Sequence, residues 1–324
     1  MIIGITGGTS GLGKRLVEYL IAKNYHVKVL VRKTSQINDL LQWGAELVYG
    51  DINEPDSLVP WIRNVDICYH IAAQVAAATK EQLFAVNVTG TKNICEAILK
   101  YNPDCRFVYC SSIIVNDIHF YNKFLQSNYA LSKYKAEKIV YEYIKKYPLK
   151  ASIITPGYIY GPYDRNFMPS VLKTLKYGLK FIVKGGEKNA AVVYVDDLCE
   201  LFHLAGIKEV ALGKKYVSVK RSDIGIHDFL KMVAAKMNYP FPQKIYPKLP
   251  LLFIASILKM IYKTFRIQST PRINNRLIDA LSYKSKYFNE NATRELNWDH
   301  RVTIPEGIDK ALAWQMDNQS TNHC

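Results

Sequence analysis

The chain has 324 residues, 49% of them hydrophobic, so it can bury a sizeable core as one large domain or as two coupled ones. Its 43 lysines and arginines outnumber its 28 acidic residues, for a formal net charge of +15. This excess favours anionic ligands, such as cofactor phosphates or an anionic membrane surface, although a solvated lysine-rich surface is the simpler explanation. There is no nucleic-acid-binding motif and no long basic run, so we expect no nucleic-acid partner.

The six cysteines lie far apart and form neither a C-x-x-C pair nor a metal-ligand spacing with histidine. We therefore expect free thiols, no metal site and a reducing cytoplasmic environment. Met1 leads directly into a strand without the segments of a signal peptide, and no stretch reaches the ~18 apolar residues of a spanning helix.

A glycine-rich turn follows the first apolar run, residues 1–6, and precedes a helical run at 14–23. The order of strand, glycine turn and helix predicts a dinucleotide site. We expect Gly7 to permit a tight turn, Gly11 to let the backbone approach a pyrophosphate, and Gly13 to allow close helix packing, with the helix N-terminus facing the anion. Thr9, Ser10 and Leu12 complete the predicted cofactor turn.

The second predicted strand, residues 26–31, is followed directly by Arg32 and Lys33. An NAD-binding unit usually has an acid here, about 20 residues past the glycines, for the ribose 2′-hydroxyl. A cation at this position suits a 2′-phosphate. We therefore favour NADP(H) over NAD(H), which stays an alternative because Arg32 could simply face solvent.

Strands and helices then alternate, with apolar strands expected at 46–49, 66–70, 105–110 and 150–155 and helices at 54–63, 80–101 and 127–146. Strands that are apolar throughout, separated by helices, predict an α/β fold with a Rossmann-type doubly wound parallel sheet. Sites in such sheets form at the carboxyl ends of the strands. The residues expected to converge there are Gly7, Asp51, Ala72, Ser112 and Pro156.

Tyr129 precedes Lys133 by one helical turn, so both side chains can point into one site. A phenol ordinarily titrates near pH ~10 and shuttles protons poorly at neutral pH. A nearby cation favours the phenolate, and lowering the pKa by ~3 units takes about 4 kcal/mol, which a desolvated lysine and a cofactor cation together could supply. An ordinary surface pair is the alternative for this spacing alone.

Taken in order, the motifs resemble the extended branch of the short-chain dehydrogenase/reductase superfamily, the NAD-dependent epimerase/dehydratases. They are closest to its 3β-hydroxysteroid dehydrogenase and dihydroflavonol reductase-like group. The similarity covers almost the whole chain, and its segments are 6–13, 50–52, 70–73, 87–91, 111–112, 129–133, 155–162, 194–198 and 292–307.

The resemblance implies that Tyr129 is the general acid/base, that Lys133 lowers its pKa and holds the nicotinamide ribose, and that Ser112 bonds the reacting oxygen. Further cofactor contacts are implied for a set of residues near the strand ends, namely Asp51, Ile52, Ala72, Ala73, Asn87, Pro156 and Tyr158. The glycine spacing is that of the classical branch, and the gap between Ser112 and Tyr129 is short for an extended member, which leaves the usual substrate lid in doubt.

Nucleotide-sugar members of this branch usually carry an arginine just before the position of Tyr194, where it clamps the substrate diphosphate. Here Val193 precedes Tyr194, and Lys188 is the nearest cation. We therefore expect an NADP(H)-dependent oxidoreductase that interconverts a hydroxyl and a keto group on a small apolar substrate. A nucleotide-sugar epimerase or dehydratase is the first alternative, and a non-catalytic NAD(P)-sensing protein is the second.

We expect residues 1–160 to form the dinucleotide-binding domain, with 191–220 returning to it, and 161–190 and 221–324 to form a smaller, mostly helical substrate lobe. An apolar cavity bordered by Ile114–Phe124 and parts of 249–265 is expected over the site. The apolar stretch 249–266 could instead pack within the lobe or make a peripheral membrane contact. A homodimer is a further open alternative.

Overall fold

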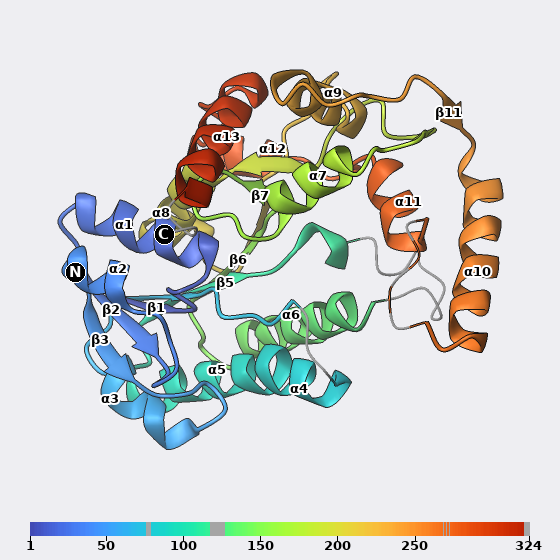
Figure 1. The fold of residues 1–324 in the computed structure, drawn as a ribbon. Helices are drawn as coiled ribbons and strands as arrows, with labels where there is room; N and C mark the ends of the chain where they lie inside the picture. Colours follow the sequence, from blue (N-terminus) through green and yellow to red (C-terminus); the bar gives the residue numbers. More distant parts are fainter. Residues whose placement is uncertain (76–78, 117–126, 268, 270, 272, 321–324) are drawn as a thin grey trace.

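The computed structural model describes residues 1–75, 79–116, 127–267, 269, 271 and 273–320. Its centre is a seven-stranded, all-parallel sheet in the order β10-β6-β5-β4-β1-β2-β3 (Figure 1). These strands are β1 Ile2–Thr6, β2 His26–Val31, β3 Glu46–Tyr49, β4 Ile67–His70, β5 Arg106–Cys110, β6 Ala151–Thr155 and β10 Lys215–Val217. The predicted doubly wound α/β fold is confirmed.

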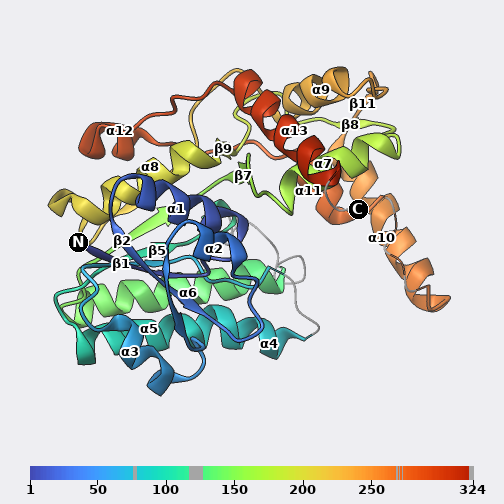
Figure 2. The same cartoon turned by 60° about the vertical axis from the view of Figure 1, so that its left-hand side comes forward.

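Helices cover both faces of this sheet (Figures 1 and 2). Helices α1 Gly11–Ala22 and α8 Val195–Ile207 pack on one face, and α3 Val59–Ile62, α5 Gly90–Tyr101 and α6 Asn128–Lys146 pack on the other. The central strands are therefore buried from both sides, which explains why they are apolar throughout instead of alternating. The short helix α2 Asn38–Gln42, which the sequence did not predict, follows β2.

Two of the predicted helices are not regular. The range 80–101 divides into α4 Lys80–Phe84, a π-helical turn Ala85–Thr89, and α5. The range 54–63 begins as a 3-10 turn, Pro55–Leu58, before α3. Short 3-10 turns are common at helix starts, and π-turns often mark functional sites, as the position of Asn87 in this one suggests.

The remaining elements form a smaller lobe on one side of the sheet (Figure 2). Its own buried cluster includes Tyr160, Phe229 and Leu281. The lobe contains two-stranded pairs β7 Tyr158–Tyr160 with β9 Val192–Tyr194 and β8 Ile182–Val183 with β11 Ile245–Tyr246, and helices α7 Phe167–Lys176, α9 Ile226–Lys236, α10 Lys248–Thr264, α11 Asn275–Leu281 and α13 Ile304–Ser320. Short helices complete the chain, at η3 Ile113–Val115, η5 Glu209–Ala211 and α12 Glu290–Leu296.

Within the described ranges, no helix combines the length and the apolar character needed to cross a bilayer.

Candidate active site

A cavity of about 320 Å³ lies at the carboxyl ends of β1, β2, β3 and β4. Its lining contains many of the residues predicted to bind the cofactor, namely Gly7, Thr9, Ser10, Arg32, Asp51, Ile52, Ala72 and Ala73. Thr6, Leu30, Ser35, Gly50, Gln74 and Val86 also line it. These six residues were not predicted as cofactor contacts. Their residue types are common in strands and turns, so only their position in the folded protein shows that they line the cavity.

The glycine turn is held in a conformation that side chains could not adopt. Gly7 has a φ of +76°, and a Cβ atom there would lie 2.5 Å from the backbone nitrogen of Ala72. A Cβ on Gly13 would lie 2.0 Å from the Gly7 carbonyl oxygen, so Gly13 permits the close packing expected of it. Ser10 caps α1 by accepting a hydrogen bond from the Gly13 backbone, which leaves the first turn of the helix beside the cavity.

Gly11 is crowded by a second part of the chain, and its predicted approach to a pyrophosphate stays a prediction. A Cβ there would lie 2.5 Å from the carbonyl oxygen of Tyr163. Because glycine has no side chain, the loop that follows β7 can pack against this position. Leu12, also predicted at the cofactor, is buried in the core cluster beneath α1 and does not line the cavity.

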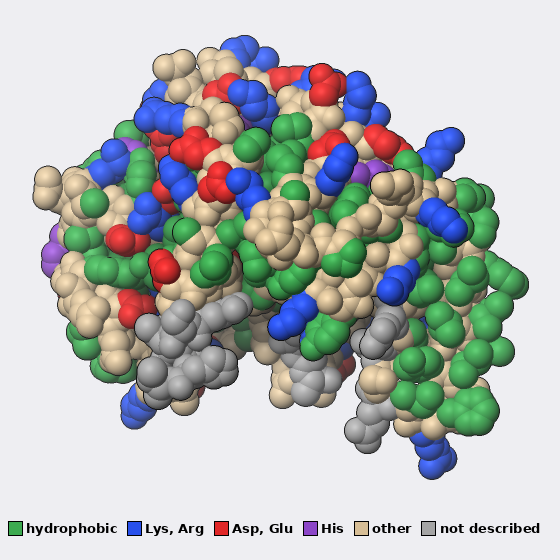
Figure 3. All heavy atoms as spheres, turned by 45° about the horizontal axis from the view of Figure 1, so that its top comes forward, with side chains coloured by type: hydrophobic (Ala, Val, Ile, Leu, Met, Phe, Trp, Pro, Cys, Tyr) green, Lys and Arg blue, Asp and Glu red, His purple; other side chains and the backbone are tan. Residues whose placement is uncertain are grey.

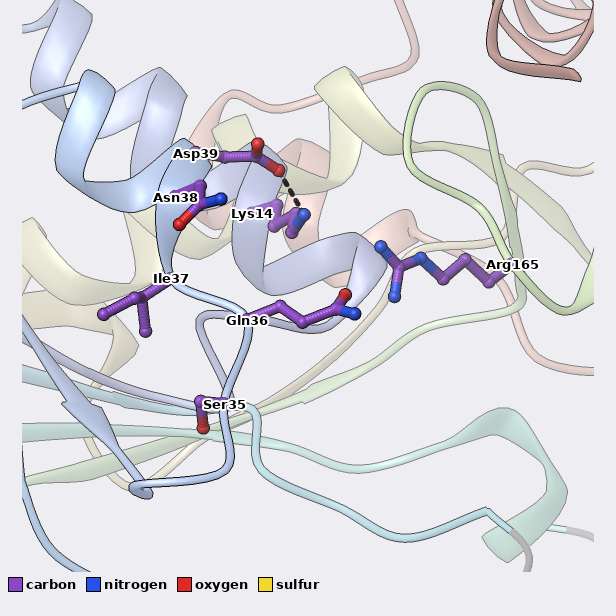
Figure 4. A pocket seen from close by; sticks show the side chains of 7 residues that line it. All are labelled: Lys14, Ser35, Gln36, Ile37, Asn38, Asp39 and Arg165. Carbon is purple, nitrogen blue, oxygen red and sulfur yellow. Dashed lines mark hydrogen bonds and ion pairs between the residues drawn. The ribbon is translucent and has the colours of Figure 1, made fainter. Parts of the chain in front are cut away.

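A second cavity of about 400 Å³ adjoins the first, because Ser35 lines both (Figure 4). Lys14 forms an ion pair with Asp39 on one side of it, and the guanidinium of Arg165 points in from the other. Arg32 is exposed at the end of β2, where its backbone nitrogen donates to Ser35 Oγ at 3.1 Å. Each of the two adjoining cavities is therefore bordered by an arginine, of which the sequence indicated only Arg32.

Ser112, Tyr129 and Lys133 come together beyond the end of β5. Ser112 directly precedes the turn η3, while Tyr129 and Lys133 lie in the first turns of α6, whose N-terminus is capped by Ser127. A side-chain hydrogen bond joins Ser112 to Tyr129. Lys133 is buried, with its Nζ donating to the Cys110 carbonyl at 2.5 Å and lying 4.4 Å from the centre of the Tyr109 ring.

Burial dominates the electrostatics of this group. It raises the pKa of Tyr129 well above its usual value, against the opposing effect of the Ser112 hydrogen bond. It lowers the pKa of Lys133 to about 8, although Cys110 and Glu137 favour the charged amine. In the protein alone, Lys133 therefore does not depress the pKa of Tyr129 enough for a phenolate near neutral pH, so a further positive charge is needed for that.

Asn87 is buried next to the cavity and connects Gln74 to helix α6 by hydrogen bonds. Its side chain donates to Ser132 Oγ at 2.8 Å and to the Gln74 carbonyl at 2.9 Å, and accepts from the Gln74 backbone at 2.7 Å. It therefore fixes the position of Gln74, which lines the cavity, relative to α6. Asn87 itself does not line the cavity, and its predicted contact with the cofactor stays a prediction.

A buried chain of hydrogen bonds links the ends of β1 and β4 to the same helix turn. The Thr91 hydroxyl donates to the Asn87 carbonyl, so His70 Nε2 donates to Thr91, and His70 Nδ1 accepts from Thr6. Burial lowers the pKa of His70 to about 3, which keeps the ring neutral, while its bonds with Thr91 and Thr6 set the tautomer.

Glu137, one helical turn beyond Lys133, is a buried acid that the sequence argument did not use. It accepts from Ser111 Oγ and pairs with Lys215 Nζ at 2.6 Å, and Lys215 also donates to Asn116 at 2.6 Å. This network joins α6 to β10 and to the turn after Ser112. The i, i+4 spacing from Lys133 was the signal that could have identified it.

Pro156 and Tyr158 lie farther along the same edge. Pro156 is buried and its carbonyl accepts from the Ile113 backbone at 2.9 Å, whereas Tyr158 is exposed and stacks on Phe167 with ring centres 5.1 Å apart. Neither lines either of the two cavities described above.

These features fit a nicotinamide dinucleotide. The bare glycine turn, the capped helix N-terminus and the adjoining cavity provide a cradle for phosphates and adenosine, and the Ser112, Tyr129 and Lys133 cluster lies at the end of a neighbouring strand. The residues described contain no cluster of metal-ligating side chains. The fold and site are those of a dinucleotide-dependent oxidoreductase.

Comparison with known proteins agrees. The model of the NAD dependent epimerase/dehydratase family matches residues 3–217. A 2-alkyl-3-oxoalkanoate reductase from Shewanella oneidensis is 25% identical, with 95% of this chain and 85% of that protein covered. A decarboxylating sterol-4-alpha-carboxylate 3-dehydrogenase from Mus musculus is 24% identical, with 95% and 89% covered. A dTDP-glucose 4,6-dehydratase from Streptomyces venezuelae, solved with NAD bound, has a TM-score of 0.75 at 19% identity, with 99% and 98% covered.

The chain therefore belongs to the NAD dependent epimerase/dehydratase family. The resemblance to the extended short-chain dehydrogenase/reductases is confirmed, as are the prediction of an NAD(P)-dependent oxidoreductase and the need for a nicotinamide cofactor.

Proposed function

We propose that the protein interconverts a hydroxyl and a keto group on a small apolar substrate, with NADP(H) as the cofactor. The observation that carries this proposal is the hydrogen-bonded pair Ser112 and Tyr129, with the buried amine of Lys133 one helical turn beyond. These are the groups that carbonyl reduction needs: two hydroxyls to hold one reacting oxygen, and a cation beside the phenol.

In the proposed reaction the nicotinamide cofactor supplies the hydride, and the protein handles the proton. Tyr129 donates its hydroxyl proton to the carbonyl oxygen during reduction, and takes it back during alcohol oxidation. Ser112 holds the same oxygen by a hydrogen bond. Lys133 places positive charge near Tyr129 and holds the cofactor ribose, and the Cys110 carbonyl fixes the position of its Nζ.

The NADP(H) preference rests on Arg32, which lines the adenosine-side cavity where an NAD-binding unit would have an acid. Arg165, across the adjoining cavity, adds a second cation to that end. Titration of NADPH and NADH should show tighter binding of NADPH, with most of the difference lost in Arg32→Ala. Lys33→Ala serves as the matched exposed control, and equal affinities in the unaltered protein would refute the assignment.

The substrate proposal rests on the missing diphosphate clamp. Lys188, the cation nearest to the clamp position, forms an exposed ion pair with Asp223 at 2.8 Å, and Val193, at that position, is buried. A diphosphate needs a fixed and convergent cation, which this arrangement does not favour. The 2-alkyl-3-oxoalkanoate reductase and the sterol-4-alpha-carboxylate 3-dehydrogenase support an apolar hydroxy or keto compound by their names.

The names of these two relatives share a chemical feature, because in both compounds the oxygen that reacts stands on the carbon β to a carboxylate carbon. Alkyl-substituted 3-oxo carboxylates are therefore the first substrates to test, and UDP- and dTDP-sugars are the comparison. NADPH oxidation should appear with the keto compounds. Turnover of only the nucleotide sugars would establish the epimerase or dehydratase alternative, and no turnover with any carbonyl would favour a non-catalytic sensor.

Three further predictions stay proposals. The division into a dinucleotide-binding domain at 1–160 and a substrate lobe is one, and the cytoplasmic location is another, supported by five free, buried cysteines among the described residues. The third is the apolar substrate cavity, whose expected border at Ile114–Phe124 lies largely outside the described residues.

A further inference from the structure

Helix α10 presents an apolar face that the rest of the described protein does not cover. Only Leu251 and Ala255 of this helix are buried, in the cluster that also contains Ile278 and Leu281 of α11. On the opposite side, Leu249, Phe253 and Met260 are 79%, 69% and 66% exposed. Ile254, Ile257, Ile261, Phe265 and Ile267 are exposed as well, and hydrophobic side chains gather over this edge of the molecule (Figure 3).

The spacing shows that these residues form one surface. Leu249, Phe253, Ile257 and Met260 follow one another by three or four positions, so they share a face of the helix, with Ile254 and Ile261 beside them. The helix stands away from the sheet at the outer edge of the lobe (Figures 1 and 2). Contiguous apolar patches of this kind mark an interaction site more often than scattered apolar residues do.

The segment of chain that contains α10 is strongly basic. Between Phe229 and Ile278 the sequence contains nine lysines and arginines and no aspartate or glutamate. Lys259, Lys263 and Arg266 lie on α10 or directly after it and are exposed, and no described carboxylate lies within ion-pair distance of them. Lys248, by contrast, pairs with Asp279 at 2.8 Å.

We propose that α10 binds the surface of an anionic phospholipid bilayer, lying in the interface with its exposed apolar face among the acyl chains. Lys259 and Lys263 stand at the margin of that face, where they can reach headgroup phosphates while Phe253 and Met260 enter the apolar layer. The helix is amphipathic and basic, and no described helix could cross the bilayer, so the contact is peripheral. This inference does not depend on the proposed reaction.

Charge also argues against a second copy of the chain as the occupant. A symmetric dimer would place the same patch of each subunit against the other. The three unpaired cations of one copy would then approach those of the other without any acid between them. Like charges brought together in this way oppose association, whereas anionic headgroups neutralise them.

The test is co-sedimentation with vesicles of phosphatidylcholine alone and of phosphatidylcholine mixed with phosphatidylserine. The protein should bind the mixed vesicles more tightly, and added salt should weaken that binding. The charge variant K259Q/K263Q/R266Q should lose on the order of 100-fold in partitioning to mixed vesicles, since each cation near the surface contributes about fivefold. The apolar variant F253S/M260S should lose binding to a similar or larger extent.

Matched controls remove the same groups elsewhere. K23Q/K92Q/K145Q takes the same charge from exposed lysines of the dinucleotide-binding side, and L41S/V210S takes two exposed apolar side chains. Both should retain vesicle binding, and NADPH binding with circular dichroism confirms that every variant is folded. If the control charge variant lost as much vesicle binding, net charge alone would explain the effect, and a role for α10 would be refuted.

Two other outcomes would overturn the proposal. The first is equal, salt-independent binding to both kinds of vesicle, or no binding to either. The second is a dimer in sedimentation velocity that F253S/M260S converts to monomers without any vesicle binding, which would make the apolar face of α10 a contact between subunits.

Discussion

At the scale of single residues, the site depends on Tyr129, whose hydroxyl is hydrogen-bonded to Ser112 and whose pKa burial raises. Replacing Tyr129 by Phe keeps the ring and removes the only group proposed to move the proton. We expect turnover to fall by about 100-fold or more, with NADPH affinity nearly unchanged. Steady-state kinetics and a cofactor titration test this, and Tyr141→Phe on the same helix is the control. Unaltered turnover in Tyr129→Phe would remove the proposed mechanism.

Lys133 makes a separate prediction about stability. Its pKa is about 8 in the folded protein against an ordinary value of 10.5, so between these pH values the unfolded chain binds the additional proton. Burial of the charged amine therefore destabilises the fold below about pH 8, and this cost disappears as the pH rises toward 10.5.

Relative to Lys133→Met, the unaltered protein should gain up to about 3 kcal/mol of unfolding free energy across that pH window. Urea unfolding of both proteins at a series of pH values measures the difference. Lys138→Met, at an exposed position on the same helix, tests whether loss of any lysine has this effect. If the difference in unfolding free energy did not change with pH, burial would not lower the pKa of Lys133.

At the scale of elements, the turn between β1 and α1 combines two constraints that other glycines show separately. Gly7 has a positive φ and is crowded by Ala72, whereas Gly44 has a φ of +84° and nothing within 4 Å of a built Cβ. Gly44→Ala should therefore cost about 1 kcal/mol from backbone strain alone. Gly7→Ala adds a backbone clash, and we expect about 3 kcal/mol or more, together with weakened cofactor binding.

Thermal unfolding with and without NADPH distinguishes these two glycine variants. The stabilisation by NADPH should persist in Gly44→Ala and shrink in Gly7→Ala. If NADPH stabilised the two variants equally, the turn would tolerate a side chain at Gly7, and the absence of one would not be needed for cofactor binding.

At the scale of the whole molecule, the C-terminal segment is fastened to the sheet layer through α8. Trp298 is 1% exposed, and its indole Nε1 donates to the Asp197 carbonyl at 2.9 Å, while the Asp197 carboxylate accepts from the backbones of Arg301 and Val302. On the same helix, Asp196 pairs with Arg15 of α1 at 2.5 Å. These contacts join residues that are far apart in the sequence into one packed layer.

Trp298→Ala should therefore lower the unfolding free energy by about 3–5 kcal/mol, because it opens a large cavity and leaves the Asp197 carbonyl without its donor. Urea unfolding measures the change, and the half-buried Trp314→Ala is the control, with a smaller loss expected. If the two variants lost the same unfolding free energy, the contact between Trp298 and α8 would add no more stability than the packing of any other tryptophan.

The sequence by itself determined the parallel sheet, because apolar strands alternating with helices have few other ways to bury both faces of every strand. It also located the glycine turn and the Tyr129 and Lys133 pair, because tight turns and i, i+4 spacing are local properties. Only the tertiary structure decided which residues meet at the strand ends, such as Ser35, Gln74 and Arg165 around the two cavities. It likewise decided that Asn87 and Glu137 brace the site, and that α10 leaves its apolar face exposed. These facts depend on contacts between distant segments, and burial, which sets the pKa values of Tyr129 and Lys133, arises only when those segments pack.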